Sequence, residues 1–98
     1  MKIEILDKAE QDIAEGFRFY EGQTPRLGDY FLDSIFSDIE SLHLYAGIHA
    51  KHFGYNRLLA KRFPFALYYR IEVSVIRVYA ILDCRRNPQR ARGRLIKS

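Results

Sequence analysis

Apolar and polar residues alternate at the start of the chain, where Ile3 and Ile5 are separated by a glutamate. A period of two predicts a short strand with one buried face. Over residues 8–20 the apolar residues instead recur every three or four positions, which predicts an amphipathic helix. Asp7, followed three positions later by Glu10, predicts a capping box at the start of this helix.

A second helical pattern follows after a short break. Thr24 and Pro25 suit the N-cap and first-turn positions of a helix. From Leu27 to Leu42 the apolar residues again recur at helical spacing, and Gly47 suits the left-handed residue that follows a helix. Two adjacent amphipathic helices with a short link predict a helical hairpin.

From Tyr55 onward the apolar period returns to two, in a region rich in tyrosine, valine, isoleucine and phenylalanine, which predicts strands. Val73 and Ser74 are expected to form a tight hairpin turn between two of them. The three expected strands are Arg57–Arg62, Ala66–Glu72 and Val75–Cys84.

Alternation assigns the strand residues to two faces of the sheet. One face is expected to be apolar, and it collects Leu67, Tyr69, Ile71, Ile76, Val78, Ala80 and Leu82. The other face is expected to carry Tyr68, Arg70, Glu72, Arg77, Tyr79 and Asp83.

Residues 85–98 contain Pro88, Gly93 and five arginines, and are expected to form a basic turn and tail rather than a long helix. The element order is therefore β-α-α-β-β-β. This order predicts a single α+β domain over residues 1–98, in which a two-helix hairpin packs on the apolar face of a small, mostly antiparallel sheet.

Composition agrees with one globular domain. The chain has 98 residues, which is too short for two hydrophobic cores. The hydrophobic fraction of 48% is sufficient for one core. No apolar run approaches the length of a membrane-spanning helix, and the first residues lack the apolar core of a signal peptide. A single cysteine, Cys84, fits a reducing compartment, so a cytoplasmic location with no membrane partner is expected.

Charge is distributed unevenly along the chain. Residues 1–49 contain ten acidic and four basic residues, whereas residues 50–98 contain two acidic and twelve basic residues, nine of them arginines. The two halves therefore carry −6 and +10, which recovers the net charge of +4. Such asymmetry favours binding to a polyanion or an acidic protein, with a basic surface that serves only solubility as the alternative.

Two segments carry a resemblance to a known family. The segment from Lys61 to Glu72 reads KRFPFALYYRIE, and the segment from Ile81 to Pro88 reads ILDCRRNP. Together with the length and the helical hairpin, they resemble the RelE/ParE superfamily of type II toxin–antitoxin toxins over nearly the whole chain. The resemblance implies that the chain is a small basic toxin from a toxin–antitoxin system of the kind that stabilises plasmids. It also implies a cognate antitoxin, encoded by an adjacent gene, whose disordered segment folds onto this domain through apolar anchors and carboxylates.

The superfamily contains two activities. RelE-like members cut messenger RNA on the ribosome with lysines and arginines on the sheet and often a C-terminal tyrosine. Only Arg86 matches that set here, because the expected upstream lysines fall on Leu58 and Ala60, the next arginine falls on Phe65 or Ala66, and the tyrosine is absent. The resemblance therefore favours the ParE-like branch, which inhibits DNA gyrase without a catalytic set. A ribosome-dependent mRNA endonuclease is the alternative, and a non-toxic basic module that binds nucleic acid or protein is the third hypothesis.

The candidate contact residues are basic side chains of the second half. Arg85 and Arg86 are the first choice, because the Asn87-Pro88 turn beside them would hold them in place. The full set expected to contact the target or nucleic acid is Arg57, Lys61, Arg62, Arg70, Arg77, Arg85, Arg86 and Arg90.

Arg70 and Arg77 are expected to be cross-strand neighbours. Either an anionic ligand lies between them or they form ordinary ion pairs with Glu72 or Asp83. The tyrosines expected on the same face, Tyr68 and Tyr79, are candidates for stacking on bases.

The remaining reactive side chains do not predict a cofactor. His49 and His52 have HxxH spacing beside His43, but no cysteine or carboxylate close in sequence completes a metal site. Cys84, at a strand end, is expected to be a small, partly buried hydrophobic residue rather than a nucleophile. No metal and no cofactor are therefore expected.

Overall fold

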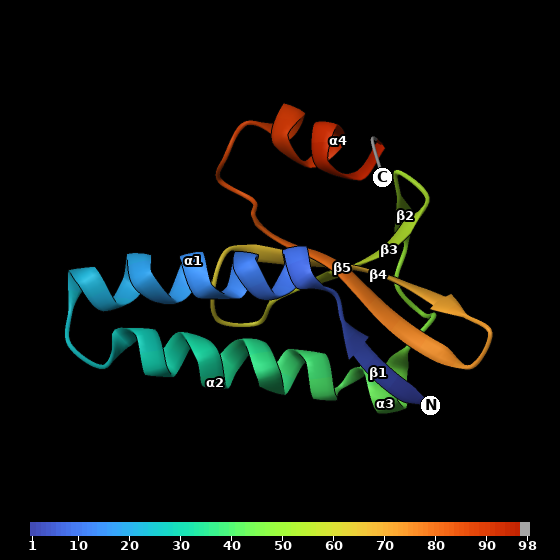
Figure 1. Cartoon of the computed structure of the whole chain (residues 1–98), viewed down its shortest axis with the longest axis horizontal. Helices are drawn as coiled ribbons and strands as arrows, with labels where there is room; N and C mark the ends of the chain where they lie inside the picture. The colour runs from blue at the N-terminus through green and yellow to red at the C-terminus, as the bar shows by residue number, and fades with distance from the viewer. Residues whose placement is uncertain (97–98) are drawn as a thin grey trace.

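Two long helices lie side by side and cover one face of a five-stranded sheet (Figure 1). A computed structural model describes residues 1–96 of the chain. The elements in chain order are β1 (Lys2–Ile5), α1 (Asp7–Gln23), α2 (Leu27–Glu40), α3 (Leu42–Tyr45), β2 (Lys51–His52), β3 (Tyr55–Leu59), β4 (Phe65–Glu72), β5 (Val75–Asp83) and α4 (Pro88–Ile96). The strand order is β1-β5-β4-β3-β2, with β1 parallel to β5 and every other pair antiparallel. The predicted hairpin-on-sheet α+β fold is confirmed.

The start of α1 differs from the expected capping box. Leu6 occupies the N-cap position and no side chain caps the helix there, so the capping prediction is wrong. Asp7 and Glu10 instead lie in the first turn, where their negative charges interact favourably with the positive end of the helix dipole.

The second helix starts later than Thr24, because the preceding helix supplies its cap. Arg26, at φ 74°, is the N-cap residue, and α2 begins at Leu27. The Glu21 carboxylate at the end of α1 accepts hydrogen bonds from the backbone N–H groups of Arg26 at 3.1 Å and Gly28 at 3.0 Å. These bonds satisfy donors that a helix start leaves unpaired, so the link between the helices is fixed by a side chain rather than by the Thr-Pro pair.

The second helix also ends earlier than predicted. The Ser41 hydroxyl donates to the Asp38 carbonyl oxygen at 2.6 Å, and the helix is interrupted there before the short α3. A serine hydroxyl that bonds back to the preceding turn competes with the helical pattern. Gly47 has φ +97°, as expected for the left-handed residue after the helical region.

The hairpin helices approach each other closely at Gly16. A Cβ atom on Gly16 would lie 2.4 Å from the Phe31 ring atom Cζ, a distance that no real contact allows. The absence of a side chain at this position lets the Phe31 ring lie against α1. This close approach places the aromatic centre of the core directly between the two helices and the sheet.

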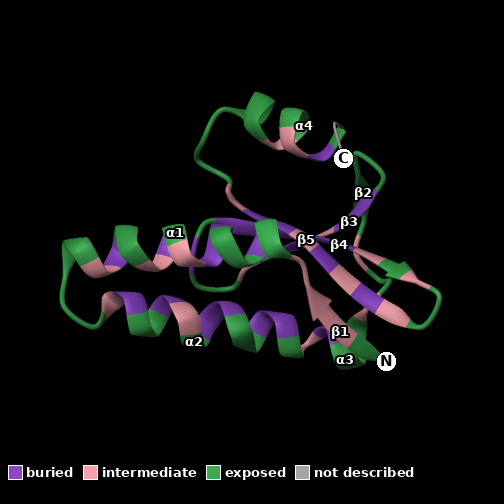
Figure 2. Ribbon diagram, in the orientation of Figure 1, coloured by how far each residue is buried: buried purple, intermediate pink, exposed green. Residues whose placement is uncertain are grey.

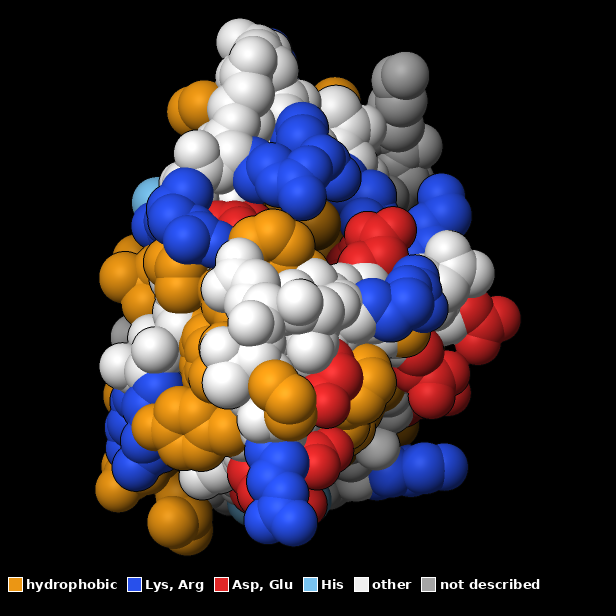
Figure 3. Space-filling model, turned by 90° about the vertical axis from the view of Figure 1, so that its left-hand side faces the viewer, with side chains coloured by type: hydrophobic (Ala, Val, Ile, Leu, Met, Phe, Trp, Pro, Cys, Tyr) orange, Lys and Arg blue, Asp and Glu red, His pale blue; other side chains and the backbone are white. Residues whose placement is uncertain are grey.

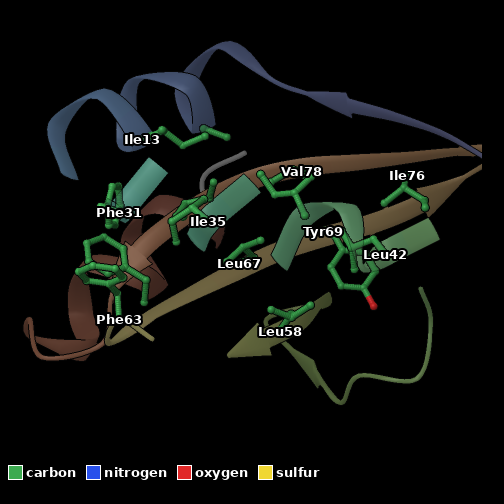
Figure 4. Close-up of a cluster of buried hydrophobic side chains, with 14 of the residues drawn as sticks. Ile13, Phe31, Ile35, Leu42, Leu58, Phe63, Leu67, Tyr69, Ile76 and Val78 are labelled. Carbon is green, nitrogen blue, oxygen red and sulfur yellow. The ribbon is translucent and has the colours of Figure 1, made fainter. Parts of the chain in front are cut away.

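The main core fills the space between the helical hairpin and the sheet (Figures 2 and 4). Its centre is aromatic: the Phe31 ring lies 5.2 Å from Tyr20, 5.2 Å from Phe63 and 5.1 Å from Phe65, measured between ring centroids. The buried members of this core are Ala9, Ile13, Tyr20, Phe31, Ile35, Ile39, Leu42, Leu58, Phe63, Phe65, Leu67, Tyr69, Ile76, Val78 and Ile81.

The strands follow the predicted segments with shifted ends. The strand expected over residues 57–62 runs over Tyr55–Leu59, and the last strand ends one residue earlier than expected, at Asp83. The tight turn at Val73 and Ser74 is confirmed. The two-residue strand β2 was not predicted, since its two exposed residues carry no apolar alternation.

A β-bulge in β5 changes which residues face the core. Tyr68 pairs with Ala80, but the next residue, Tyr69, pairs with Val78, so Tyr79 is an extra residue in β5. Past this point every side chain of β5 is moved to the other face. Ile81 therefore joins the hairpin-side core, and the prediction that Ala80 and Leu82 share a face with Val78 is wrong.

Helix α4 replaces the basic tail that the sequence predicts. The Asn87 side-chain oxygen accepts from the Gln89 backbone N–H at 2.9 Å, and Pro88 begins the helix, so Asn87-Pro88 is a helix start and not only a turn. The helix lies over the far face of the sheet (Figure 1). It closes a second, smaller apolar cluster, formed by Tyr55, Ala66, Tyr68, Ala80 and Leu95. Within residues 1–96, no helix has the length and apolar character needed to cross a bilayer.

Candidate functional site

A cleft of about 490 Å³ lies between α1 and the connection from β5 to α4. Its walls combine basic side chains with apolar and aromatic ones. Figure 3 views this end of the molecule, where lysine and arginine side chains gather in the upper half among acidic ones. The lining residues used below are Asp12, Glu15, Phe19, Arg57, Tyr68, Asp83, Cys84, Arg85, Arg86 and Arg90.

Arg85 is tied into one wall of the cleft. Its guanidinium donates to both carboxylate oxygens of Asp83, at 3.1 and 2.9 Å, and to the Tyr20 hydroxyl at 3.2 Å. The hydrogen bond from Arg85 holds the pKa of the Asp83 carboxyl below its usual value. Arg85 therefore anchors the β5–α4 turn to α1, and much of its hydrogen-bonding capacity is already used.

A buried ion pair fixes α4 at the back of the same cleft. Asp12, which is 8% exposed, accepts from Arg94 Nη1 at 2.9 Å and Nη2 at 2.8 Å, and also from the Ile81 backbone N–H at 3.0 Å. The pair joins α1, α4 and β5 just beyond the bulge at Tyr79. The position of α4, and with it the shape of the cleft, depends on this carboxylate.

Three other arginines of the cleft form no ion pair with any carboxylate of residues 1–96. They come from three separate elements: Arg57 from β3, Arg86 from the turn after β5, and Arg90 from α4. The Arg57 Nε atom is buried and has no hydrogen-bond partner in the described part of the chain. The cleft therefore contains guanidinium groups that no carboxylate of residues 1–96 engages in an ion pair.

Cys84 lies beside this group. Its sulfur is the acceptor for Arg57 Nη2 at 3.9 Å, and the residue is exposed. The expectation that Cys84 is partly buried is wrong, because β5 ends one residue before it and leaves it in the turn.

Arg70 and Arg77 are cross-strand partners as predicted, but they lie outside the cleft. Arg77 donates to Glu4 at 2.7 Å and to Glu72 at 3.1 Å. Of the two predicted alternatives, an anionic ligand or ordinary ion pairs, the structure shows ordinary ion pairs for Arg77. The hydrogen bond from Tyr79 is the main reason that the pKa of Glu72 is held below its usual value.

Arg70 is held by rings rather than by a carboxylate. Its guanidinium carbon lies 3.9 Å from the Tyr55 ring centroid, and its Nε donates to the Gly54 carbonyl oxygen at 3.2 Å. Asp83, the other carboxylate proposed for this pair, bonds Arg85 instead. A contact of Arg70 or Arg77 with a target stays a prediction.

The remaining predicted contact residues are distributed over other parts of the surface. Lys61 and Arg62 are exposed in the segment after β3, and the Lys61 backbone N–H bonds the Asp38 carboxylate of α2 at 3.3 Å. Tyr68 is only 5% exposed and forms part of the cleft floor, unlike the exposed stacking residue that the sequence suggested. Tyr79 is half-buried and remains a stacking candidate.

None of the three histidines lines the cleft. His49 Nδ1 lies 2.5 Å from the hydroxyl oxygen of Tyr69, which also accepts from the Gly47 N–H, and burial lowers the pKa of His49. No group of three or more histidine, cysteine or acidic side chains within residues 1–96 is arranged to hold a metal ion.

The sequence pattern did not predict the ion pair of Asp12 and Arg94. A signal was present, because Asp12 lies three residues after Ala9 and four before Gly16, on the buried stripe of α1. A carboxylate on a buried stripe requires a partner. Nothing in the local pattern identified Arg94 as that partner, since it is distant in sequence.

The arrangement is suited to holding an anion. Arginine guanidinium groups bind phosphate and carboxylate oxygens through paired hydrogen bonds. The buried and half-buried carboxylates of the cleft, Asp12 and Asp83, are each occupied by an arginine, and Glu15 lies exposed on the α1 wall. Proton transfer to or from a substrate would need a side chain of suitable pKa that is not already held in this way.

Comparisons with known proteins agree with this architecture at the level of the fold. No protein-family model and no curated protein sequence matches the chain. A solved chain described as "Chromosomal ParDE TA system from P. aeruginosa" is similar in structure, with a TM-score of 0.75 and 21% sequence identity over 83% of this chain and 92% of that chain. This protein therefore has the RelE/ParE-like α+β fold implied by the sequence resemblance, a fold that it shares with a chain of that ParDE system.

Proposed function

We propose that this protein is the toxin of a type II toxin–antitoxin system and that, when free of its antitoxin, it inhibits DNA gyrase. The observation that carries the proposal is the shared fold, which extends over 92% of a chain from a ParDE toxin–antitoxin system. Fold alone does not define activity. The gyrase assignment is therefore argued from the cleft.

The chemistry of the cleft favours a binding protein over a nuclease. Cleavage of RNA needs a base for the 2′-hydroxyl and an acid for the leaving oxygen. Of the three carboxylates that line the cleft, Asp12 and Asp83 are engaged with Arg94 and Arg85, and Glu15 lies exposed on the α1 wall. The arginines outnumber these carboxylates, and Arg57, Arg86 and Arg90 form no ion pair with a carboxylate of residues 1–96. A cleft rich in cations without ion-pair partners supports an inhibitor that acts by binding its target.

A ribosome-dependent endonuclease is the second candidate, because Arg86 supports it. Arg86 is the residue that matches the RelE-like set, and it lies in the wall of the cleft. In that case the arginines would stabilise the charge that develops on the phosphate during cleavage.

The expected antitoxin has two kinds of surface to bind. Carboxylates of the antitoxin would meet the arginines, and its apolar anchors would enter a groove of about 500 Å³ between α1 and α2. Ala14, Phe17 and Phe36 line that groove, and Phe36 is 44% exposed. A segment that folds on binding recognises such grooves through apolar side chains at helical spacing. An Ala14→Arg variant should fail to copurify with the product of the adjacent gene while it keeps its far-ultraviolet circular dichroism.

The test is brief induction of the protein alone in a bacterial host, followed in the same cells by mapping of new RNA 5′ ends and measurement of DNA breaks and supercoiling. The proposal expects relaxed or broken DNA with intact messages, and purified protein should stop supercoiling by gyrase in vitro. Arg86→Ala should weaken the effect, whereas Arg92→Ala, which removes the same charge from an exposed position outside the cleft, should not.

Cuts in translated messages that disappear in Arg86→Ala would establish the endonuclease instead. Unaffected growth together with normal gyrase activity would contradict both toxin assignments and leave a basic binding module.

A further inference from the structure

We propose that His49 is an acid-sensitive switch, whose protonation breaks its hydrogen bond with the buried hydroxyl of Tyr69 and releases residues 46–52 from the sheet. These residues are the connecting segment between α3 and β2, together with β2 itself. Neither His49 nor Tyr69 lines the cleft, so the switch is a property separate from the proposed function.

The hydroxyl of Tyr69 joins the core to the connecting segment. Tyr69 is 0% exposed, and its ring lies in the main core (Figure 4). Its oxygen accepts a hydrogen bond from the Gly47 backbone N–H at 2.9 Å and lies 2.5 Å from Nδ1 of His49. One side chain of β4 therefore holds two residues of a segment in which no residue is buried.

The surroundings of this hydroxyl define the protonation state of His49. A tyrosine hydroxyl has one hydrogen to donate, and a buried donor requires an acceptor. Tyr69 is closed to solvent, and within residues 1–96 the hydrogen-bond partner that can accept from it is Nδ1 of His49. We therefore assign the hydrogen of the neutral imidazole to Nε2. A protonated imidazole carries hydrogens on both nitrogens, so uptake of one proton removes the acceptor of Tyr69.

A positive charge at His49 has no compensating carboxylate. Burial lowers the pKa of the half-buried His49, and no carboxylate of residues 1–96 forms an ion pair with it. The one acidic side chain on the neighbouring elements, Glu72, bonds Arg77 and Tyr79 on the opposite face of β4. The titratable and charged groups of these elements are His43 and Tyr45 of α3, Lys51 and His52 of β2, Tyr55 and Arg57 of β3, and Tyr68, Tyr69, Arg70 and Glu72 of β4.

The direction of the pH effect follows from this lowered pKa. The unfolded chain takes up a proton at His49 at a higher pH than the folded protein does. The contribution of His49 to stability is therefore present above its unfolded-state pKa and is lost as the pH falls through its folded-state pKa.

Few other contacts hold the segment that the switch would release. The two residues of β2 are exposed and pair only with Asn56 and Tyr55 of β3. The Asn56 side-chain amide donates to the His49 carbonyl oxygen at 2.8 Å, and the Arg57 backbone N–H donates to the Ala50 carbonyl oxygen at 3.0 Å. A segment with few apolar contacts opens locally at low cost while the core stays folded. Because β2 is the edge strand, its release would leave β3 as a new open edge of the sheet.

The first test is a pH titration by nuclear magnetic resonance from about pH 7.5 to about pH 4.5. The ring signals should show hydrogen on Nε2 of His49 at the upper end, and His49 should titrate at a lower pH than the exposed His52. The protection factor of the Gly47 amide against hydrogen exchange should fall by about tenfold as His49 titrates, because this N–H reports directly on the Tyr69 hydroxyl.

Three results of this titration would overturn the proposal. The first is a His49 ring that carries its hydrogen on Nδ1 in the neutral form. The second is a His49 ring that stays neutral to the end of the range, and the third is a Gly47 protection factor that does not change while His49 titrates.

Matched variants separate the switch from general loosening in acid. His49→Asn supplies a side-chain oxygen near the position of Nδ1 that does not titrate in this range, so the Gly47 protection factor should become independent of pH. His52→Asn removes a histidine three positions away and should leave the pH dependence unchanged. Equal flattening in both variants, or none in His49→Asn, would contradict the assignment to His49.

Removal of the hydroxyl should imitate protonation. Tyr69→Phe keeps the ring in the core and should lower the Gly47 protection factor at pH 7.5 by about tenfold, to the value that the unchanged protein reaches in acid. Full protection of Gly47 in a folded Tyr69→Phe protein would show that the hydroxyl does not hold the segment. If Tyr69→Phe does not fold, the comparison of His49→Asn with His52→Asn still decides the proposal, and neither comparison depends on gyrase.

Discussion

The two faces of the sheet are covered in different ways. On one face the helical hairpin closes a large apolar core whose centre is the Phe31 ring. On the other face the short helix α4 closes a small cluster around Leu95 and depends on the buried ion pair of Asp12 and Arg94. The comparison teaches that most of the apolar burial lies on the hairpin side. The side with thinner apolar cover keeps a polar anchor and an open cleft, and it is the side on which we propose that a charged partner binds.

The largest expected effect is on the hairpin side. Phe31→Ala removes a fully buried ring and should lower the free energy of unfolding by about 3–5 kcal/mol, because both the transfer free energy and the contacts around the cavity are lost. Leu95→Ala on α4 should lower it by about 2 kcal/mol, since a terminal helix is free to relax into the space. Urea denaturation measures both values.

If Phe31→Ala does not fold, Phe31→Leu still tests the comparison, with an expected loss of about 1–2 kcal/mol. A larger loss in Leu95→Ala than in Phe31→Ala would show that α4, and not the hairpin, dominates the stability of the fold.

The second effect concerns the ion pair on the α4 side. Asp12→Ala leaves Arg94 and the Ile81 backbone N–H without this acceptor. The free energy of unfolding should fall by about 2–3 kcal/mol. This loss is smaller than for a fully buried ion pair, because the Arg94 side chain is 23% exposed. Hydrogen exchange should show faster exchange in α4 than in α1, because the anchor of α4 is lost while the hairpin core remains.

A double-mutant cycle with Arg94→Met isolates the coupling between the two side chains. Loss of protection that spreads evenly through α1 and α2 would contradict a local role for the pair, and a coupling near zero would show that Asp12 acts only through Ile81.

The smallest effect is a difference in pH dependence between Asp83, which lines the cleft, and Asp38, which lies in α2 of the helical hairpin. Arg85 holds the pKa of Asp83 below its usual value, so its contribution to stability is present above the unfolded-state pKa and is lost as the pH falls through the folded-state pKa. Burial raises the pKa of Asp38, a residue of α2 that is 4% exposed. The contribution of Asp38 to stability is therefore present at low pH and is lost as the pH rises through the folded-state pKa of its carboxyl group.

Unfolding free energies from pH 7 into the acid range at constant ionic strength test this prediction. Asp83→Asn should flatten the loss of stability in acid, and Asp38→Asn should steepen it, because it removes the opposing contribution while its amide oxygen still accepts from the Lys61 N–H. Parallel curves for the two variants and the unchanged protein would contradict the assignment of either shift.

Much of the hairpin side was predictable, because its signals are local. The helical spacing around Ile13 and Phe31 and the alternation of Leu67 and Tyr69 each report burial within one element. The details that failed there depend on contacts between elements, as when Glu21 of α1 caps the start of α2.

The candidate site was predictable only in composition. Arginines were expected to contact a partner, and four of them, Arg57, Arg85, Arg86 and Arg90, line one cleft. The sequence did not separate Arg85, whose bonds are structural, from Arg57, whose buried Nε is unpaired. That distinction depends on which carboxylate lies within reach. Asp83 bonds Arg85 two residues away in the same turn, whereas packing across the chain brings Asp12 to Arg94 and leaves Arg57 without a carboxylate of residues 1–96 as partner.

The amino-acid sequence by itself determined the layers of this protein, because the period of apolar residues along a helix or strand is a property of a few neighbouring positions. Only the tertiary structure decided which residues line the cleft. The bulge at Tyr79 reverses the faces of the last strand, α4 folds back over the sheet, and Asp12 meets Arg94 across most of the chain. Each of these features depends on the pairing of groups far apart in sequence, and a local pattern carries no information about such pairs.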